Sequence, residues 1–502
     1  MNSAGLQNTQ GPFAAALRAA MQCLQEGRPA EAERIYNQIV QQAPGNTAAL
    51  FNLGLLAARR GSAKEAQLLF KKVLDIDPKD ADAAVSLAIT YADMGMATEA
   101  QAAAAQALAL SPAPPALSQL GAMYGELGLT EKALETLRAA LKAQPENINA
   151  LATLAAYDKL ATDDPACRAL IKLSATGDRL PPADRARVEF ALGKARLDQG
   201  DEKTAYAAYA LGNKIKKSTY SGFNISRFEE YFDSLAALFT PALVTKHASA
   251  AQPKGERPVF IVGMQRSGST LAAQILDSHP AARSIGESSA SRLSFPPPPG
   301  EKFARDTRVT AALTERLSPD LLAGIRKSYA GYARLAADKD AVVVDKMLPN
   351  FMLLGLLKLA MPEAKFIHCQ RDPVDAGLSV WTTLFFEPTP WAYDQRDIAR
   401  YYKAQMKLMA HWQKLFPQAI HVLSYEKLVA EQEAETKKLL EFCGLPWDPR
   451  CLDFHTASGM VKTASVMQVR QPINAASVGK GSRAAAYLKD MLDELNKGVV
   501  AG

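Results

Sequence analysis

Charged residues follow each of several short apolar runs in the second half of the chain. Arg266, Lys346 and Arg371 are cations of this kind, and Glu287 is a carboxylate between the first two. The runs are rich in β-branched residues and predict buried strands; they are Val259–Val262, Ala341–Val344, Phe366–His368 and Ile420–Leu423. Because the carboxyl ends of parallel strands share one edge of a sheet, we expect these groups to converge on one crevice. Such a crevice suits a small anion.

The first run leads into the loop 263–268, and Ser269–Ser278 predicts a helix. A strand, a glycine loop and a helix together offer several backbone N–H groups to an anion. The loop nearly matches G-x-x-x-x-G-K-[ST], but Ser269 replaces the lysine that serves β- and γ-phosphates. That substitution argues against an ATPase, a GTPase or a P-loop kinase. The loop suits a nucleotide with a short anionic 5′ end, which Arg266 and the nearby hydroxyls can help to bind.

Helical patterns separate the apolar runs. Phe351–Ala360 and Ile398–Phe416 are two such stretches. Strands that alternate with helices predict a doubly wound parallel sheet. We therefore predict a multidomain chain in which a P-loop-like α/β domain with a parallel sheet forms the second half.

The first half of the chain is a repeat array. Three residue types recur at spacings of 34, 34 and 33: Gly27, Gly61, Gly95 and Gly128; Ala32, Ala66, Ala100 and Ala133; Pro44, Pro78, Pro112 and Pro145. The glycine permits a tight turn, the alanine lets two helices pack closely, and the proline ends the second helix. The units resemble tetratricopeptide repeats, and we predict an all-α solenoid of four repeats over residues 13–147.

Residues 148–250 keep a helical pattern but lose the strict period. Leu192, Gly193, Gly200 and Ala205 recover repeat-like spacing, which indicates a fifth, degenerate unit and a capping region. A short array of this kind has a concave face that can bind a peptide or protein. A purely structural or dimerising solenoid accounts for the pattern equally well, so an oligomer is compatible with it.

Composition limits the remaining options. The chain has 502 residues and a net charge of +6, with 58 basic and 52 acidic residues interspersed, so we expect no nucleic-acid partner. Its five cysteines have no CxxC spacing, which predicts free thiols. No signal core and no apolar run of about 18 residues is present, so we expect no membrane span and a cytoplasmic protein. His279 and His368 are isolated, and we expect no metal.

Five segments of the second half resemble a known family. RSGST with a downstream HP, and then IHCQRDPVDAGLS, are similar to the donor-binding segments of sulfotransferases that use 3′-phosphoadenosine 5′-phosphosulfate. DKMLPN, FCGLPWD and VKTASVMQVRQPINAASVGK resemble the tyrosylprotein sulfotransferase branch. Bacterial proteins that join tetratricopeptide repeats to this domain are similar over nearly the whole chain. The resemblance implies a sulfotransferase domain over residues 256–495.

The resemblance also implies a role for individual residues. Glu287 matches the general base, and Lys346 and Ser465 match groups that stabilise the leaving bridge oxygen. The 5′-phosphosulfate is expected to bind at Arg266, Ser267, Gly268, Ser269 and Thr270. Arg371 and Ser379 would bind the 3′-phosphate. The residues expected to close over the nucleotide are Tyr425, Ser465, Gln468, Asn474 and Lys480.

The sequence departs from the family pattern at two positions and leaves the acceptor open. Gln265 stands where proline is usual, and Gly481 stands where repeat-linked relatives usually have tryptophan. A tyrosine of a peptide or protein, a sugar hydroxyl and a small phenol would all need the same base and donor. The alternative to a sulfotransferase is a repeat-based scaffold whose α/β domain binds a nucleotide without catalysis.

Overall fold

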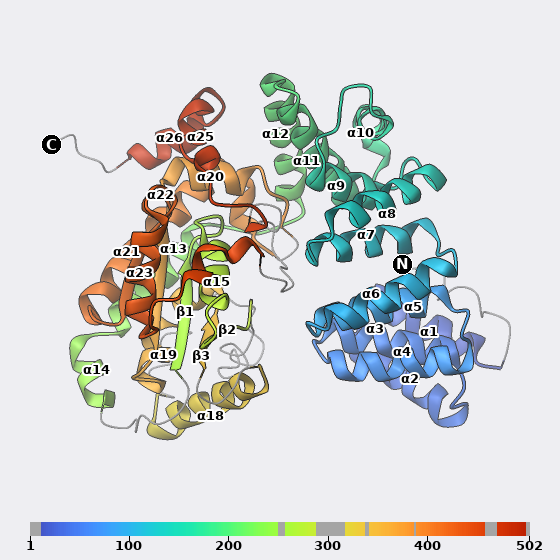
Figure 1. Cartoon of the computed structure of the whole chain (residues 1–502), viewed down its shortest axis with the longest axis horizontal. Coiled ribbons are helices and arrows are strands. Elements are labelled where there is room, and N and C mark those ends of the chain that lie inside the picture. Colours follow the sequence, from blue (N-terminus) through green and yellow to red (C-terminus); the bar gives the residue numbers. More distant parts are fainter. Residues whose placement is uncertain are drawn as a thin grey trace. The chain divides into compact units, whose positions relative to one another are not determined.

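A computed structural model describes residues 12–248, 257–287, 317–336, 341–385, 388–456 and 469–497. Within these residues the chain forms two compact units (Figure 1). The first ends at Ala208 and the second begins at Tyr209, so helix α12 (Glu202–Ser218) crosses the boundary. The limits predicted from the sequence, 13–147, 148–250 and 256–495, stay predictions.

The first unit is built from consecutive helices that pair with their neighbours. Their bounds are α1 Ala14–Gln25, α2 Pro29–Gln42, α3 Thr47–Arg59, α4 Ala63–Ile76, α5 Ala81–Asp93, α6 Ala97–Ala109, α7 Pro114–Glu126, α8 Thr130–Ala143, α9 Ile148–Tyr157, α10 Pro165–Ala175 and α11 Pro182–Asp198. The 3₁₀ turn η2 (Gly177–Arg179) lies between α10 and α11. The helical hairpins predicted for the repeats are therefore present.

The repeated glycines and alanines do what their spacing predicts. Gly27, Gly61, Gly95 and Gly128 lie in the turns between paired helices with φ of 75°, 83°, 73° and 79°, a region that favours glycine. Ala32, Ala66, Ala100 and Ala133 are completely buried between the helices. Gly200 (φ 80°) and the buried Ala205 repeat this geometry between α11 and α12.

The second unit contains a parallel sheet of five strands in the order β2-β3-β1-β4-β5. The strands are β1 Arg257–Gly263, β2 Ala282–Ser284, β3 Val342–Asp345, β4 Lys365–Gln370 and β5 Ile420–Ser424. The predicted α/β fold and the four predicted strands are confirmed. The short strand β2 was not predicted. Central β1 pairs with β3 on one side and β4 on the other, so the loop that follows β1 starts between two neighbouring strand ends.

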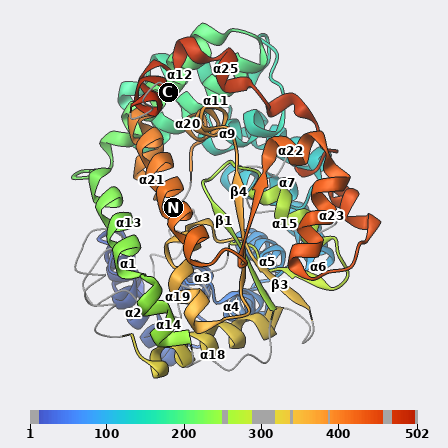
Figure 2. The same ribbon diagram turned by 90° about the vertical axis from the view of Figure 1, so that its left-hand side faces the viewer.

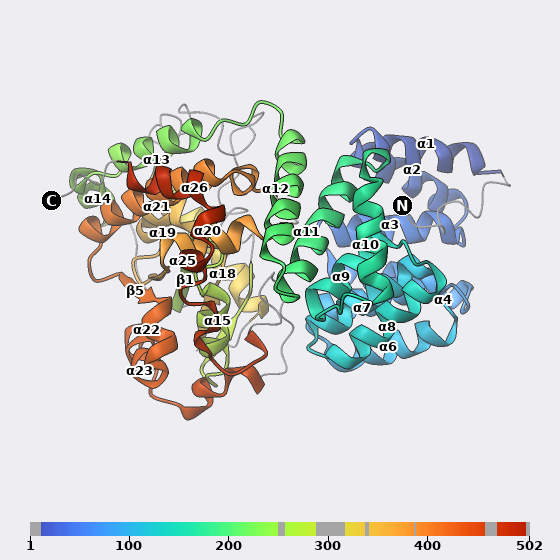
Figure 3. The same ribbon diagram turned by 90° about the horizontal axis from the view of Figure 1, so that it is seen from above.

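Helices cover both faces of the sheet (Figure 2). On one face lie α13 (Ser226–Leu238), α19 (Leu354–Ala360) and α21 (Gln395–Leu415); on the other lie α15 (Ser269–Asp277) and α23 (Gln432–Cys443). Helix α21 packs against both α13 and α26 (Lys489–Asn496), as Figure 3 shows. The remaining elements are α14 Pro241–Ala248, α18 Pro319–Ala336, η3 Leu348–Met352, α20 Pro373–Trp381, η4 Pro390–Tyr393, α22 Tyr425–Ala430, η5 Pro449–Leu452, η6 Phe454–Thr456, η7 Ala475–Ser477, α25 Lys480–Arg483 and η8 Ala485–Tyr487.

Aromatic side chains fill the core of the second unit. The rings of Phe260 in β1 and Phe366 in β4 stack at 5.3 Å between centroids. On the α21 face, the Trp412 indole donates its N–H to the carbonyl of Phe351 at 2.9 Å. All five cysteines are buried free thiols, as predicted. No helix in the described part of the chain is long and apolar enough to cross a membrane.

Candidate functional site

The loop 263–268 turns sharply between β1 and α15. Gly263, Arg266 and Gly268 have φ of 138°, 68° and 88°. A Cβ on Gly263 would lie 2.7 Å from the Cys369 carbonyl oxygen of β4, so only glycine fits there. The Ser267 hydroxyl donates to the carbonyl of Met264 at 2.6 Å and closes the turn. Nothing in the structure explains Gln265.

The loop ends at the N-terminus of α15, which begins at Ser269. The Ser269 and Thr270 side chains are buried in this first turn. The unpaired backbone N–H groups of a helix N-terminus carry partial positive charge and favour anions. Arg266 lies in the loop that leads to this end of the helix, and Arg371 donates to the same loop, so the arrangement suits an anion.

Arg371 joins the loop to a distant segment. It follows β4, and its Nη1 donates to the carbonyl of Arg266 at 3.1 Å while its Nη2 donates to the carbonyl of Ser477 at 2.6 Å. The Tyr425 ring lies over its guanidinium with 4.7 Å between Cζ and the ring centroid. Its buried Nε has no hydrogen-bond partner among the described residues. The guanidinium is thus fixed in orientation.

Arg266 lies beside Arg371. Its Nε donates to the Ser379 hydroxyl of α20 at 2.9 Å. Burial, and then the positive charge of Arg371, lower the pKa of Arg266 to about 10. Two guanidinium groups held side by side repel each other, and a bound anion would relieve that repulsion. The structure thus brings together Arg266, Arg371 and Ser379, and Tyr425 with them.

Lys346 and Glu287 form an ion pair at the edge shared by β2 and β3. The Lys346 side chain is only 4% exposed, whereas the Glu287 side chain is 42% exposed. The backbone N–H of Lys346 donates to the carbonyl of Gly286 at 2.9 Å, which ties the two strand ends together. A buried cation and an accessible carboxylate therefore lie in direct contact at the carboxyl end of the sheet.

Asp345, the last residue of β3, is buried next to Lys346. It is completely buried, and its Oδ1 accepts the backbone N–H of Met347 at 3.0 Å. Its Oδ2 has no hydrogen-bond partner among the described residues. Burial raises the pKa of Asp345 to about 7. The sequence places Asp345 directly after a predicted strand, whereas the structure makes it the last, buried residue of β3.

The C-terminal residues predicted to cover the nucleotide are only partly described. Ser465 and Gln468 lie outside the described residues. Asn474 is exposed and accepts the backbone N–H of Ala476 at 3.1 Å, so it caps its own turn. Lys480 is exposed in a segment that packs on α20. Gly481 is buried there, and a Cβ on it would lie 2.6 Å from the backbone carbon of Val374, which leaves no room for tryptophan in this arrangement.

The two histidines His279 and His368 are engaged in hydrogen bonds. His368 in β4 lies between Gln370 and Gln405, with ring nitrogens 3.2 and 3.1 Å from their amide nitrogens. Burial lowers the pKa of His368 to about 4, so the ring is neutral. His279 contacts the carbonyl of Pro446 at 3.0 Å. Over the described residues, no group of three or more His, Cys, Asp or Glu side chains is arranged to hold a metal ion.

Comparison with known proteins finds family matches in both halves of the chain. A model of the sulfotransferase family matches residues 258–449, and models of the tetratricopeptide repeat match residues 13–81, 57–124 and 114–147. The chain joins tetratricopeptide repeats to a sulfotransferase domain. An uncharacterized protein of Aquifex aeolicus is 30% identical over 329 residues, and the match spans 64% of this chain but only 42% of that relative.

Solved structures with similarity include sulfotransferases. The sulfotransferase domain of the Synechococcus PCC 7002 olefin synthase is 18% identical with a TM-score of 0.35, covering 49% of this chain and 96% of that one. Sulfotransferase STF9 from Mycobacterium avium is 13% identical with a TM-score of 0.29, covering 66% of this chain and 97% of that one.

The range of the sulfotransferase match divides the candidate site. The loop 263–268, Glu287, Lys346, Arg371 and Tyr425 all fall within residues 258–449. Asn474 and Lys480 fall outside it. The family match therefore does not extend to the C-terminal segment of the site.

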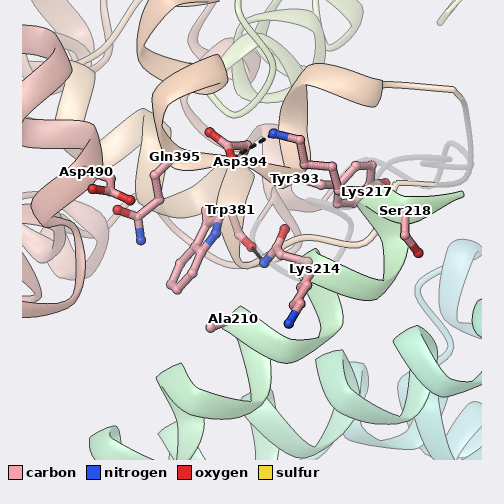
Figure 4. Close-up of a pocket in the computed structure, with 10 residues that line it drawn as sticks. Ala210, Lys214, Lys217, Ser218, Trp381, Tyr393, Asp394, Gln395 and Asp490 are labelled. Carbon is pink, nitrogen blue, oxygen red and sulfur yellow. Dashed lines mark hydrogen bonds and ion pairs between the residues drawn. The ribbon is translucent and has the colours of Figure 1, made fainter. Parts of the chain in front are cut away.

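The second unit also has a cavity of about 480 Å³ (Figure 4). Trp381 and Tyr393 form aromatic walls, and Asn213 donates to the carbonyl of Trp381 at 2.8 Å. Lys217 pairs with Asp394 at 2.8 Å beside it. None of the residues predicted to bind the donor lines this cavity.

Proposed function

We propose that this chain transfers a sulfuryl group from 3′-phosphoadenosine 5′-phosphosulfate to an acceptor hydroxyl by in-line displacement. The observation that carries the proposal is the contact between Glu287 and Lys346 at the strand edge that also bears the anion-binding loop. A base for the acceptor and a cation for the leaving group are both needed in sulfuryl transfer, and this edge supplies the pair.

The donor is anionic at both ends, and the site has cations to match. The 5′-phosphosulfate would bind to the N–H groups of the loop 263–268 and to the first turn of α15. The 3′-phosphate would bind at Arg371 and Ser379, with Arg266 between the two anions. The contact of Arg266 with Ser379 and with Arg371 supports one continuous cationic strip. Ser269 in place of the P-loop lysine favours this donor over a triphosphate.

In the reaction, the acceptor oxygen forms a bond to sulfur while the bond from sulfur to the bridging phosphate oxygen breaks. Glu287 accepts the proton of the acceptor hydroxyl. Lys346 stabilises the negative charge that develops on the leaving oxygen, and Ser465 is assigned to the same oxygen by the family resemblance. Since Lys346 and Glu287 contact each other, donor binding must draw Lys346 away to release the carboxylate. The leaving product is 3′-phosphoadenosine 5′-phosphate.

The acceptor we propose is a tyrosine of a peptide or protein that the repeats help to bind. Two observations support it: the C-terminal segments resemble the tyrosylprotein branch, and tetratricopeptide repeats match residues 13–147. Incubation of the full chain with labelled donor and a cell extract tests it. Label in protein, lost after mild acid treatment that cleaves tyrosine sulfate, is the expected outcome. Label only in glycan or small molecules would contradict the acceptor while leaving sulfuryl transfer intact.

The donor and the base are tested together. We expect 3′-phosphoadenosine 5′-phosphate, but not ATP, to raise the melting temperature of the full chain. Glu287→Gln should lower transfer of labelled sulfate roughly 100-fold or more while keeping nucleotide binding. Glu433→Gln is the matched control, since Glu433 lies exposed on α23 and pairs only with Lys437 in the described structure. Nucleotide binding without transfer to any acceptor would favour a non-catalytic scaffold, and absence of nucleotide binding would refute the proposal.

A further inference from the structure

Three hydrogen bonds attach the segment 477–481 to Arg371 and to Asp375 at the start of α20. The Ser477 carbonyl accepts from Arg371 Nη2 at 2.6 Å. The backbone N–H groups of Gly479 and Gly481 donate to the two carboxylate oxygens of Asp375, at 2.7 and 2.6 Å. Arg371 and Asp375 lie four residues apart and 4.0 Å from each other. A cation thus binds the carbonyl of this segment and an anion binds its amides.

Both carboxylate oxygens of Asp375 take part in this attachment. It is only 2% exposed, and a carboxylate that is buried to this degree needs hydrogen bonds or a cation to be stable. Each of its oxygens accepts one N–H group of the segment, and hydrogen bonds to a charged acceptor are stronger than neutral ones. The local packing is equally restrictive, since a Cβ on Gly481 would lie 2.6 Å from the backbone carbon of Val374 and 2.8 Å from the backbone nitrogen of Asp375.

The other end of the attachment lies in the candidate donor site. The same Arg371 guanidinium that binds Ser477 also donates to the Arg266 carbonyl in the loop after β1. A phosphate arriving at Arg371 would compete with the Ser477 carbonyl for Nη2. Asp375 does not face this competition, because its oxygens are already bound to Gly479 and Gly481. It can therefore keep the segment in place when Arg371 changes partner.

We propose that Asp375 is a positioning residue that holds the segment 477–481 over the 3′-phosphate end of the donor site, so that a bound nucleotide leaves slowly. The inference rests on the proposed function, because it takes the ligand to be a 3′-phosphorylated nucleotide. Lys480 lies between the two amides that Asp375 binds, so Asp375 also fixes the backbone of a residue predicted to contact the nucleotide.

Asp375→Asn is the main test. The amide keeps one acceptor oxygen but turns an N–H₂ group toward a backbone N–H, so one hydrogen bond is lost and two donors face each other. In the full chain we expect backbone amides of residues 474–483 to exchange with deuterium roughly 10-fold faster. A fluorescent analogue of 3′-phosphoadenosine 5′-phosphate should dissociate roughly 10- to 100-fold faster, with its association rate changed less than about 3-fold.

A second variant, Gly481→Ala, perturbs the segment 477–481 without changing a charge. Gly481→Ala should displace the segment because the added methyl meets the α20 backbone, and it should reproduce both effects. Gly324→Ala is its matched control, since Gly324 is exposed on α18 with nothing within 4 Å of an added Cβ. Asp233→Asn serves the same purpose for Asp375, because Asp233 is exposed and pairs with Lys407. Asp375→Glu keeps both acceptor oxygens, so the nucleotide should dissociate from it more slowly than from Asp375→Asn.

The outcomes separate this inference from the proposed function. If wild-type protein does not bind the nucleotide, the proposed function fails, and this inference fails with it. If wild type binds it, but Asp375→Asn and Gly481→Ala release it at the wild-type rate although residues 474–483 exchange faster, only the positioning role of Asp375 is refuted. Unchanged exchange in both variants would also refute it. Fast release together with fast exchange, at melting temperatures near that of wild type, is the result we expect.

Discussion

The two ends of the candidate site are held in place in different ways. At the arginine end (Arg266, Arg371 and Ser379), each guanidinium is oriented by hydrogen bonds, and the Tyr425 ring covers Arg371. At the lysine end (Lys346 and Glu287), one ion pair between described residues joins a buried cation to an accessible carboxylate.

The difference matches two different tasks. Groups that only bind an anion gain from a fixed geometry, because less conformational freedom is lost when the ligand arrives. Groups that move a proton and stabilise a leaving oxygen must exchange partners during the reaction, and one ion pair with an exposed member separates more easily than a buried network. We therefore expect changes at the lysine end to affect turnover and changes at the arginine end to affect affinity.

The largest expected effect is that of Lys346→Met on turnover. The variant keeps the length of the side chain but removes the cation near the leaving oxygen. Transfer at saturating donor should fall roughly 100- to 1,000-fold, or about 3 to 4 kcal/mol. Calorimetric affinity for 3′-phosphoadenosine 5′-phosphate should change less than about 5-fold. Lys407→Met, at an exposed pair on α21, is the control. Equal losses of turnover and affinity would remove the distinction between the two ends.

Arg371→Lys should show the converse pattern. Lysine keeps the charge but cannot donate to the Arg266 carbonyl, the Ser477 carbonyl and a phosphate in the fixed planar geometry of arginine. Calorimetry should show nucleotide affinity roughly 30-fold weaker, or about 2 kcal/mol. Turnover at saturating donor should change less than about 5-fold. Arg396→Lys, at an exposed pair with Asp490, controls for the exchange itself. Affinity near that of wild type would mean that Arg371 does not bind the 3′-phosphate.

Sequence patterns predicted the elements of the fold better than they predicted contacts. The runs that became β1, β3, β4 and β5 are apolar and β-branched, so their burial is visible in the residue types. Strand β2 has only three residues, and Ala282–Ser284 carries no such pattern. The repeat turns were predictable because each requires glycine at one position, and the sequence repeats that requirement.

Long-range contacts account for what the sequence did not show. Arg371 was predicted from its place after a strand, but its partners are backbone carbonyls of the loop and of Ser477, which any residue could supply. Asp375 was not predicted as a site residue from the sequence, because its two partners lie more than 100 residues away. Gly481 appeared only as a departure from the family pattern, and the reason for it is the closeness of the α20 backbone.

Asp345, next to Lys346, and His368, in the strand that leads to Arg371, should contribute to stability with opposite pH dependence. Burial raises the pKa of Asp345 to about 7, so its contribution to stability is present below its unfolded pKa of about 4 and is lost as pH rises to 7. Burial lowers the pKa of His368 to about 4, so its contribution is present above its unfolded pKa of about 6.5 and is lost as pH falls to 4. In wild type the two slopes partly cancel between about pH 4 and 6.5.

In Asp345→Asn, the pH dependence of the free energy of unfolding that His368 causes should no longer be cancelled by Asp345. The amide stays neutral, so urea unfolding should show the variant gaining about 3 kcal/mol relative to wild type as pH rises from about 4 to 7. The free energy of unfolding of the variant should rise with pH over this range. Asp233→Asn, at an exposed site, should follow the wild-type curve. A difference between variant and wild type that does not depend on pH would show that Asp345 does not titrate in this range.

The smallest effect we expect is that of Gly268→Ala, which tests how closely the loop and Tyr425 fit. The added Cβ would lie 2.6 Å from Tyr425 Cδ2, and φ is 88° at this position. Strained backbone costs about 1 kcal/mol, and a tilted Tyr425 ring should weaken nucleotide binding a few-fold as it leaves Arg371. In a Tyr425→Ala background the added methyl has room, so only the backbone cost should remain. If Gly268→Ala costs the same free energy of unfolding in both backgrounds, Tyr425 does not pack on the loop, and the arginine end is less fixed than its hydrogen bonds indicate.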